Sequence, residues 1–399
     1  MKAVAVFPGA RDIRIIDRDE PRITHPAQVK LRMLEVGVCG TDKEICRFEY
    51  GTPPDGSDFL IIGHESLAEV VEVGPAATGV TPGELVVSTV RHPCSHPECS
   101  ACQSGNQDFC ATGDFTERGI KGLHGFMAEY VVDDARYLNV VPATLREVAV
   151  LVEPMSIAAK ALTQTVTILR RLPWFEAGHM RQVGGRALRV LVLGAGAVGL
   201  LGALELAHAG FDTYVYDRAP APNPKSRLVE SVGATYVSEA TAPDFAHLIG
   251  QMSLVYEATG ASRLAFRALR LLAPNGIFIF TGVPALGAAS EVETDTIMRD
   301  LVLKNQVILG TVNAGKAAYA AAISALGDIY RRWPDAIKAI ISGRYPVAAY
   351  RELLLGQAGG IKQVLAFDKS LVSAADAERT GAHAERDQRG PRGPREARG

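Results

Sequence analysis

The sequence has almost no net charge and no unbroken apolar run long enough to cross a membrane. Its 42 Lys and Arg stand against 44 Asp and Glu, a formal net charge of -2, so we expect neither nucleic acid nor a membrane surface as a partner. The longest apolar stretch, residues 188–206, is broken by glycines and by Arg189 and Glu205, and it predicts a strand, a turn and a helix. No basic segment followed by a long apolar stretch begins the chain, so we expect no secretory signal and a cytoplasmic location.

Cysteine is scarce and unevenly placed, because all six residues lie within the first 110 positions. In a chain of this length without a secretory signal, this distribution favours metal binding or catalysis over a disulfide framework. Cys46, seven residues after Cys39, is expected to be a small buried side chain.

The length of 399 residues predicts two domains, and 47% hydrophobic with 22% charged residues is typical of a globular enzyme. Up to about residue 150, short apolar runs separated by Gly, Pro and Asp predict a β-rich, barrel-like domain. From residue 188 to about 310 the pattern changes to β-α alternation, which indicates a parallel, doubly wound sheet. We expect the following segment to return and complete the first domain. The predicted divisions are residues 1–186, 187–305 and 306–368.

The remaining tail, residues 369–399, contains few large apolar side chains. From Leu371 onward it holds six Arg and five acidic residues together with Gly and Pro. Such a segment cannot bury enough surface to offset its ordering entropy, so we expect it to be disordered.

Three separated residues, Cys39, His64 and Glu153, suggest the ligands of a catalytic metal. A thiolate, an imidazole and a carboxylate are donors that zinc accepts while its fourth position stays free for a reactant. Glu65 follows His64 directly, and the sequence leaves open whether it ligates the metal or lies just outside the ligands. Asp42 is expected to orient the loop.

A second group of cysteines is close in sequence, with gaps of four, two and seven residues. Four thiolates close a tetrahedral shell and leave no position for a reactant, so we expect a structural zinc that supports a lobe at about residues 91–112. The alternative is a set of reduced cysteines without metal. His92 and His96 are expected on the surface. The predicted ligands are Cys94, Cys99, Cys102 and Cys110.

A glycine-rich run follows the apolar strand 189–193 and opens a helix predicted at 197–208. In this context the glycines permit a tight turn and a close approach of the backbone to a pyrophosphate at the helix N-terminus. Asp217 ends the next strand, where a carboxylate binds the ribose hydroxyls and repels a 2′-phosphate, whereas Arg218 acts in the opposite sense. NAD is therefore favoured and NADP stays open. The run consists of Gly194, Ala195, Gly196, Ala197, Val198 and Gly199.

These motifs resemble those of the medium-chain zinc-dependent dehydrogenases, and the resemblance covers about residues 1–368. Cys-Gly-Thr-Asp at 39–42, Gly-His-Glu at 63–65 and Glu-Pro at 153–154 are shared with alcohol and polyol dehydrogenases. Other segments resemble the glucose (aldose) 1-dehydrogenases in order and spacing. They are residues 112–115, 119–120, 125–127, 133–134, 137–138, 304–306 and 310–313.

The resemblance implies an α/β protein with a GroES-like β-rich catalytic domain and a Rossmann domain. It implies that sugar hydroxyls are faced by Thr41, Asp114, Glu153 and Asn313. It further implies that the cofactor lies along Ala195 to Val198, Asp217 and Arg218, Thr281, Gly282 and Val283, and Thr311, Val312 and Asn313. Family members often have Glu where Asp114 stands, which leaves the identity of the sugar open.

The hypothesis that follows is oxidation of the anomeric hydroxyl of an aldose such as D-glucose to the lactone by NAD(P)+. One zinc would act as a Lewis acid and a second would be structural, and Thr41 would pass the proton outward. The nearest alternative is a polyol or secondary-alcohol dehydrogenase, and one of a different class is a nucleotide-sensing, zinc-lobed binding protein. The open metal set argues against the last. By resemblance we expect a homo-oligomer, a dimer or a tetramer.

Overall fold

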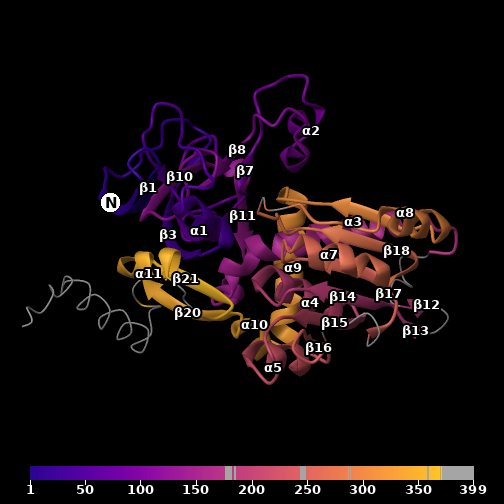
Figure 1. The fold of residues 1–399 in the computed structure, drawn as a ribbon. Helices are drawn as coiled ribbons and strands as arrows, with labels where there is room; N and C mark the ends of the chain where they lie inside the picture. Colours follow the sequence, from indigo (N-terminus) through magenta and orange to yellow (C-terminus); the bar gives the residue numbers. More distant parts are fainter. Residues whose placement is uncertain are drawn as a thin grey trace, which may run out of the picture.

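A computed structural model describes residues 1–175, 182–183, 186–242, 249–285, 287, 289–356, 359–368 and 370, with the backbone alone at 182–183 and 186–187. The predicted disordered tail lies outside these residues except at position 370. The chain forms a β-rich unit at one end and a unit built on a parallel sheet at the other (Figure 1).

The β-rich unit is built on a mainly antiparallel sheet of order β11-β6-β5-β3-β21-β20, with β10 also pairing β3. Apolar side chains alternate along β3 toward a core that includes Leu31, Met33 and Val36. The C-terminal strands β20 and β21 lie beside β3, from the other end of the chain (Figure 1). The strands are β3 (Gln28–Gly37), β5 (Glu65–Val73), β6 (Leu85–Ser88), β10 (Tyr130–Asp134), β11 (Leu138–Val141), β20 (Ile341–Pro346) and β21 (Lys362–Ala366).

Shorter elements surround this sheet. A small antiparallel sheet has the order β2-β1-β4, and a small mixed sheet has the order β7-β8-β9, in which β8 and β9 are parallel. Helix α2 lies in a loop that projects away from both units at the top of Figure 1. The elements are β1 (Lys2–Phe7), β2 (Asp12–Asp17), α1 (Gly40–Cys46), β4 (Leu60–Ile61), β7 (Arg91–His92), α2 (Ser100–Gln103), η1 (Gln107–Phe109), β8 (Thr116–Arg118), β9 (Gly122–Leu123), α10 (Pro334–Lys338) and α11 (Tyr350–Leu355).

The second unit is a parallel sheet of order β16-β15-β14-β17-β18-β19, which confirms the predicted doubly wound α/β class. The last strand lies beyond residue 305, and the sheet extends to residue 310. The elements are β14 (Arg189–Leu193), α4 (Ala197–His208), β15 (Asp212–Asp217), α5 (Pro224–Ser231), β16 (Thr235–Ser238), β17 (Met252–Glu257), α7 (Ser262–Ala268), β18 (Leu272–Phe280), α8 (Thr294–Leu303) and β19 (Val307–Gly310). The antiparallel pair β12 (Gln182–Val183) and β13 (Arg186–Ala187) precedes them in the chain.

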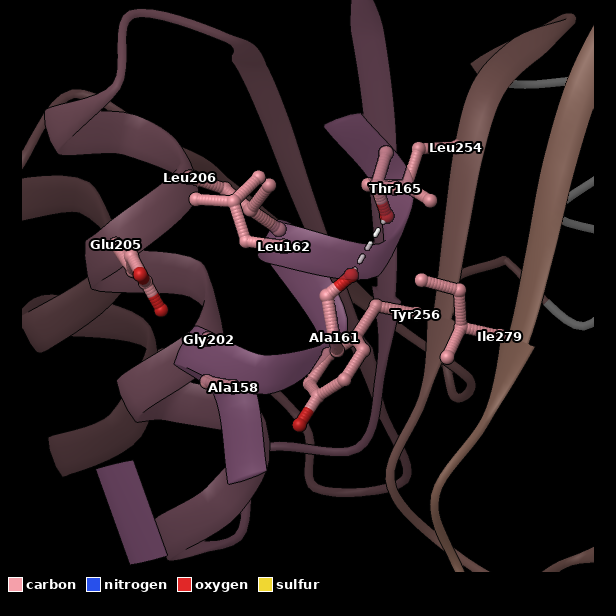
Figure 2. A pocket seen from close by; sticks show the side chains of 10 residues that line it. All are labelled: Ala158, Ala161, Leu162, Thr165, Gly202, Glu205, Leu206, Leu254, Tyr256 and Ile279. Atoms are coloured by element: carbon pink, nitrogen blue, oxygen red, sulfur yellow. Dashed lines mark hydrogen bonds between the residues drawn. The ribbon is translucent and has the colours of Figure 1, made fainter. Parts of the chain in front are cut away.

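Helices α3 (Val152–Leu169) and α9 (Lys316–Arg332) join the two units and pack on each other. Against the parallel sheet, α3 and α4 enclose a small pocket with mostly apolar walls (Figure 2). Three polar side chains reach this pocket, Thr165 from α3, Glu205 from α4 and Tyr256 from β17. Among the described residues, no helix combines the length and the apolarity that a membrane span requires.

Candidate active site and metal centres

The main sheet brings Cys39, His64 and Glu65 together. Gly37 at the end of β3 pairs with Glu65 at the start of β5, so the residues that flank this pair meet at one edge of the sheet. Cys39 precedes α1 and His64 precedes β5. The ligand atoms of these three residues lie within 4.8 Å of one another. A sulfur, a nitrogen and a carboxylate oxygen at this separation fit the donor set of an open zinc.

Asp42 supports two of these donors from α1. One of its oxygens accepts a hydrogen bond of 2.8 Å from the backbone N–H of Cys39, and the other lies 3.3 Å from Nδ1 of His64. Burial by itself lowers the pKa of His64, but the Asp42 carboxylate outweighs it and holds this pKa well above its usual value. A carboxylate on one ring nitrogen fixes the orientation of the imidazole, so that the other nitrogen is left for a metal.

Glu65 is held by a lysine from the far end of the chain. Nζ of Lys362 lies 2.7 Å from both carboxylate oxygens of Glu65 and donates to the carbonyl of Val38 at 3.1 Å. A Cβ on Gly37 would come within 2.1 Å of Oε2 of Glu65, so only glycine leaves room for this carboxylate. The reasoning from sequence missed Lys362, although a lysine within the apolar run 362–366 was a detectable signal.

Glu153, the predicted third ligand, lies in the first turn of α3 and is 9% exposed. Burial raises its pKa to about 7, the Glu65 and Asp42 carboxylates add to the shift, and His64 opposes it. Glu153 therefore faces the same groups. Among the described residues, however, the close set of donors contains Glu65 and leaves Glu153 out. Thr41 is partly exposed in the first turn of α1, two residues from Cys39. We call Cys39, His64, Glu65 and Glu153 the open site.

The lobe at residues 91–112, called the cysteine lobe below, gathers its four cysteines. The Sγ atoms of Cys94, Cys99, Cys102 and Cys110 lie within 4.8 Å of one another, and all four are free thiols. Four thiol sulfurs at this spacing fit a closed tetrahedral metal site.

The two histidines of the cysteine lobe have other partners. His92 was expected on the surface, but its side chain is 14% exposed and stacks on Tyr137 at 3.8 Å, and burial lowers its pKa to about 4. His96 is partly exposed, with Nε2 2.6 Å from Asp114 and Nδ1 3.2 Å from Glu98.

Asp114, a predicted sugar contact, therefore pairs with His96, and its side chain is 66% exposed. The acidic residue that contacts Asn313 is Glu117, three positions later on β8. Glu117 is 5% exposed, and its Oε1 accepts a hydrogen bond of 2.7 Å from Nδ2 of Asn313 and one of 3.0 Å from Nε of Arg91. The sequence shows only an acidic residue in the short run 116–118, and its burial became visible in the structure.

The glycine-rich run forms the turn between β14 and α4. Gly194 has a φ of +101°, a conformation that favours glycine. A Cβ on Gly199 would lie 2.0 Å from the carbonyl oxygen of Gly194, so a side chain there would force the helix away from the strand. The N-terminus of α4 is thus exposed to an anion at the carboxyl edge of the sheet.

Asp217 ends the neighbouring strand β15 and points back to this turn. Its carboxylate accepts hydrogen bonds from the N–H groups of Ala195 at 2.9 Å and Ala219 at 3.0 Å, and lies 3.5 Å from Nζ of Lys225. Burial opposes ionisation, but these donors hold the pKa of Asp217 below its usual value. Arg218 is exposed.

The predicted cofactor segments 281–283 and 311–313 follow β18 and β19 at the same edge. Together with Asp108 and Phe109 of the cysteine lobe and Lys160 of α3, residues of these segments line a cavity of about 340 Å³. Glu257 at the end of β17, which the sequence analysis missed, accepts N–H groups from Thr259 at 2.6 Å and Gly260 at 2.9 Å. The cavity thus lies where a parallel sheet binds its ligands, with walls from both units.

Comparison with known proteins matches both parts of the chain. Residues 25–143 match the model of the alcohol dehydrogenase GroES-like domain, and residues 146–367 match that of the glucose dehydrogenase C-terminus. Glucose 1-dehydrogenase of Methanocella arvoryzae is 40% identical over 91% of this chain and 98% of its own length. The enzyme of Thermoproteus tenax is 38% identical over 92% and 99%. The structure of Haloferax mediterranei glucose dehydrogenase in complex with NADP, Zn and gluconolactone is similar with a TM-score of 0.81 at 30% identity, covering 92% of this chain and 100% of that one.

Proposed function

The chain belongs to the glucose dehydrogenase family of zinc-dependent medium-chain dehydrogenases, and we propose that it oxidises the anomeric hydroxyl of an aldose such as D-glucose to the lactone with NAD(P)+. The observation that carries this proposal is the open site, in which Cys39 and His64 lie with two buried carboxylates, Glu65 within 4.8 Å of both and Glu153 close enough to interact with His64. Such a set leaves one coordination position for a reactant, which a binding module does not need.

We assign a catalytic zinc to Cys39, His64 and a carboxylate, and a structural zinc to the cysteine lobe. Bound at the open site, the metal supplies a Lewis acid that lowers the pKa of the sugar hydroxyl. Because Lys362 already neutralises Glu65, we assign the third zinc ligand to Glu153. Glu65 is assigned to the surroundings of the zinc, just outside its ligands. Asp42 keeps His64 oriented throughout.

The sugar is assigned to polar side chains from both units. Glu117 replaces Asp114 as the proposed acidic contact, because it is buried and bonded to Asn313. A carboxylate and an amide suit neighbouring sugar hydroxyls as acceptor and donor. Thr41 is assigned to pass the hydroxyl proton outward. A nicotinamide held along the cofactor segments would supply the acceptor for the C1 hydride, so that the C1–O bond could become a carbonyl.

The cofactor is assigned to the turn at 194–199, to Asp217 and to segments 281–283 and 311–313. We favour NAD, because the Asp217 carboxylate lies at the end of β15 and would repel a 2′-phosphate. Lys225, 3.5 Å from this carboxylate, is the group that would favour NADP.

A panel of aldoses, polyols and secondary alcohols with each cofactor tests the proposal. We expect D-glucose or a close aldose to give the highest kcat/KM, and the lactone to be the product. Turnover of sorbitol or a secondary alcohol with none of any aldose would replace the proposal by the polyol alternative.

We also propose a homo-oligomer. β19 is the end strand of its sheet, and α8 before it exposes Met298, Val302 and Leu303 by 70%, 69% and 64%. A strand edge beside exposed apolar side chains favours pairing with a second copy. Light scattering that gives the mass of one chain would overturn this. The predicted cytoplasmic location stays a prediction.

A further inference from the structure

We propose that Lys160 is a positioning residue that holds the segment 311–313 in place for the nicotinamide. It lies on α3, outside the metal ligands and the sugar contacts assigned above, and it lines the cavity at the carboxyl edge of the parallel sheet. The inference rests on the proposed binding of a nicotinamide nucleotide at this edge.

The first support is the pair of contacts that Lys160 makes. Its Nζ donates to the backbone carbonyl of Val312 at 3.0 Å and lies 2.7 Å from Oδ2 of Asp108. The Lys160 and Asp108 side chains are 7% and 5% exposed. A buried ammonium needs its partners, so the lysine is held where it fixes one carbonyl of a segment that is otherwise exposed at Val312.

The second support is the way Asp108 itself is held. Oδ1 of Asp108 lies where a Cβ on Gly315 would approach to 2.7 Å, at the residue that precedes α9. The Asp108 carboxylate therefore lies between an ammonium and the N-terminus of a 17-residue helix, and both favour its negative charge. Asp108 belongs to η1 within the cysteine lobe, so this lobe reaches the cofactor segment through Lys160.

A third support is a parallel connection on the other side of the segment. Arg91 donates to the carbonyl of Asp108 at 3.3 Å and to Glu117 at 3.0 Å, and Glu117 accepts Asn313 at 2.7 Å. Lys160 on α3 thus holds the backbone of Val312 and Glu117 on β8 holds the side chain of Asn313, while Arg91 links Asp108 to Glu117. Two anchors on adjacent residues restrict both the position and the rotation of the segment that follows β19.

The test measures nucleotide binding directly in the zinc-loaded full chain. For Lys160→Met we expect the Kd of NADH and of NADPH to rise by about tenfold, as for the loss of one hydrogen bond to a charged group. We expect kcat to fall with a larger primary isotope effect from C1-deuterated glucose, because a misplaced nicotinamide makes hydride transfer more rate-limiting, while the sugar KM changes little. Lys160→Arg should restore part of both losses, and Asp108→Asn should change them in the same direction as Lys160→Met.

The matched control is Lys121→Met. Lys121 donates to the carbonyl of Gly113 at 2.5 Å and lies over the Phe115 ring, close to the cysteine lobe, but these contacts do not include segment 311–313. The nucleotide Kd and the isotope effect of Lys121→Met should equal those of the wild type. The proposal is overturned if Lys160→Met lowers only the active fraction and leaves the Kd and the isotope effect unchanged. It is also overturned if Lys160→Met and Lys121→Met weaken nucleotide binding equally.

Two further outcomes are separable. Should Lys160→Met fail to fold, Lys160→Arg and Asp108→Asn decide by the same two readouts, and normal values in both overturn the proposal. Nucleotide binding needs no sugar, so a wild-type protein that binds NADH and oxidises no aldose refutes the proposed substrate and leaves the Lys160 measurement decisive.

Discussion

The open site and the cysteine lobe place their donors by opposite means. The open site collects residues from positions 39 to 153, and protein groups already hold them: Asp42 on His64, and Lys362 on Glu65. The cysteine lobe takes its donors from positions 94 to 110, and within the described residues its core cluster consists of the cysteines themselves and Ala101. The first site is formed by the fold, whereas we expect the second to need a bound metal in order to fold.

The largest expected effect is therefore on folding, in the cysteine lobe. Cys102→Ser should remove one metal and unfold the lobe, because structural zinc contributes about 10–16 kcal/mol to small metal-dependent folds. Zinc analysis should fall from two ions per chain to one, and limited proteolysis should cut between residues 91 and 112. Cys46→Ser is the control, since Cys46 is a buried cysteine outside both sites and both ions should stay. Two zinc ions and an intact lobe in Cys102→Ser would contradict the comparison.

In the open site the expected effect is on turnover instead. His64→Ala should lower kcat by roughly three orders of magnitude or more, since metal assistance is worth several kcal/mol of transition-state stabilisation. The protease resistance of the cysteine lobe should stay close to that of the wild type, whereas the thermal midpoint should fall because the buried Asp42 carboxylate loses its imidazole partner. Equal losses of folding in His64→Ala and Cys102→Ser would refute the division of roles.

The charge compensation in the open site can be tested at Lys362. Lys362→Met leaves Glu65, which is 1% exposed, without its counter-charge, and removing one partner of a buried pair typically costs about 3–5 kcal/mol. Chemical denaturation measures the loss. The double variant Glu65→Gln/Lys362→Met removes both charges and should recover part of it. A double variant less stable than Lys362→Met would mean that the pair does not act as described.

Glu205 sharpens the comparison, because it is a carboxyl that lacks the support given to Glu65. Its Oε2 has no hydrogen-bond partner in the described part of the chain, and burial raises its pKa to about 8 (Figure 2). The folded state then binds a proton that the unfolded state releases, so stability falls as the pH rises from about 4.5 to about 8, by an amount on the order of a few kcal/mol. Glu205→Gln should lose less Tm than the wild type between pH 5 and pH 8.5. Parallel Tm profiles would exclude this role.

The smallest expected effect is on the kcat/KM for aldose, and it distinguishes Glu117 from Asp114 as the acidic sugar contact. Glu117→Ala should lower the kcat/KM for aldose, because Asn313 loses its acceptor. The decrease should correspond to about 1–3 kcal/mol of lost transition-state stabilisation, the usual loss from an unpaired buried polar partner. Asp114→Ala should change it by less than about 0.5 kcal/mol, as is usual for an exposed position. The reverse order would restore Asp114 as the sugar contact.

Local patterns in the sequence predicted the elements that are formed locally. The cysteine spacing predicted the group that the structure gathers at 94–110, and the glycine-rich run predicted the turn before α4, which begins at Ala197 as expected. The β-α alternation predicted the parallel sheet. The last strand of this sheet, β19, ends at Gly310, at the end of the predicted alternation. Residues that are close in sequence can come together through local structure, with little dependence on the rest of the chain.

The sequence by itself thus determined the fold class and the donor set of the cysteine lobe, since each depends on residues that are close in sequence. Only the tertiary structure decided which charges meet. Lys362 reaches Glu65 across 297 positions because β21 pairs with β3, and Asn313 reaches Glu117 across 196 because β19 leads back to the β-rich unit. Sheet register and domain packing set such distances, and a buried charge is stable only where they bring its partner to it.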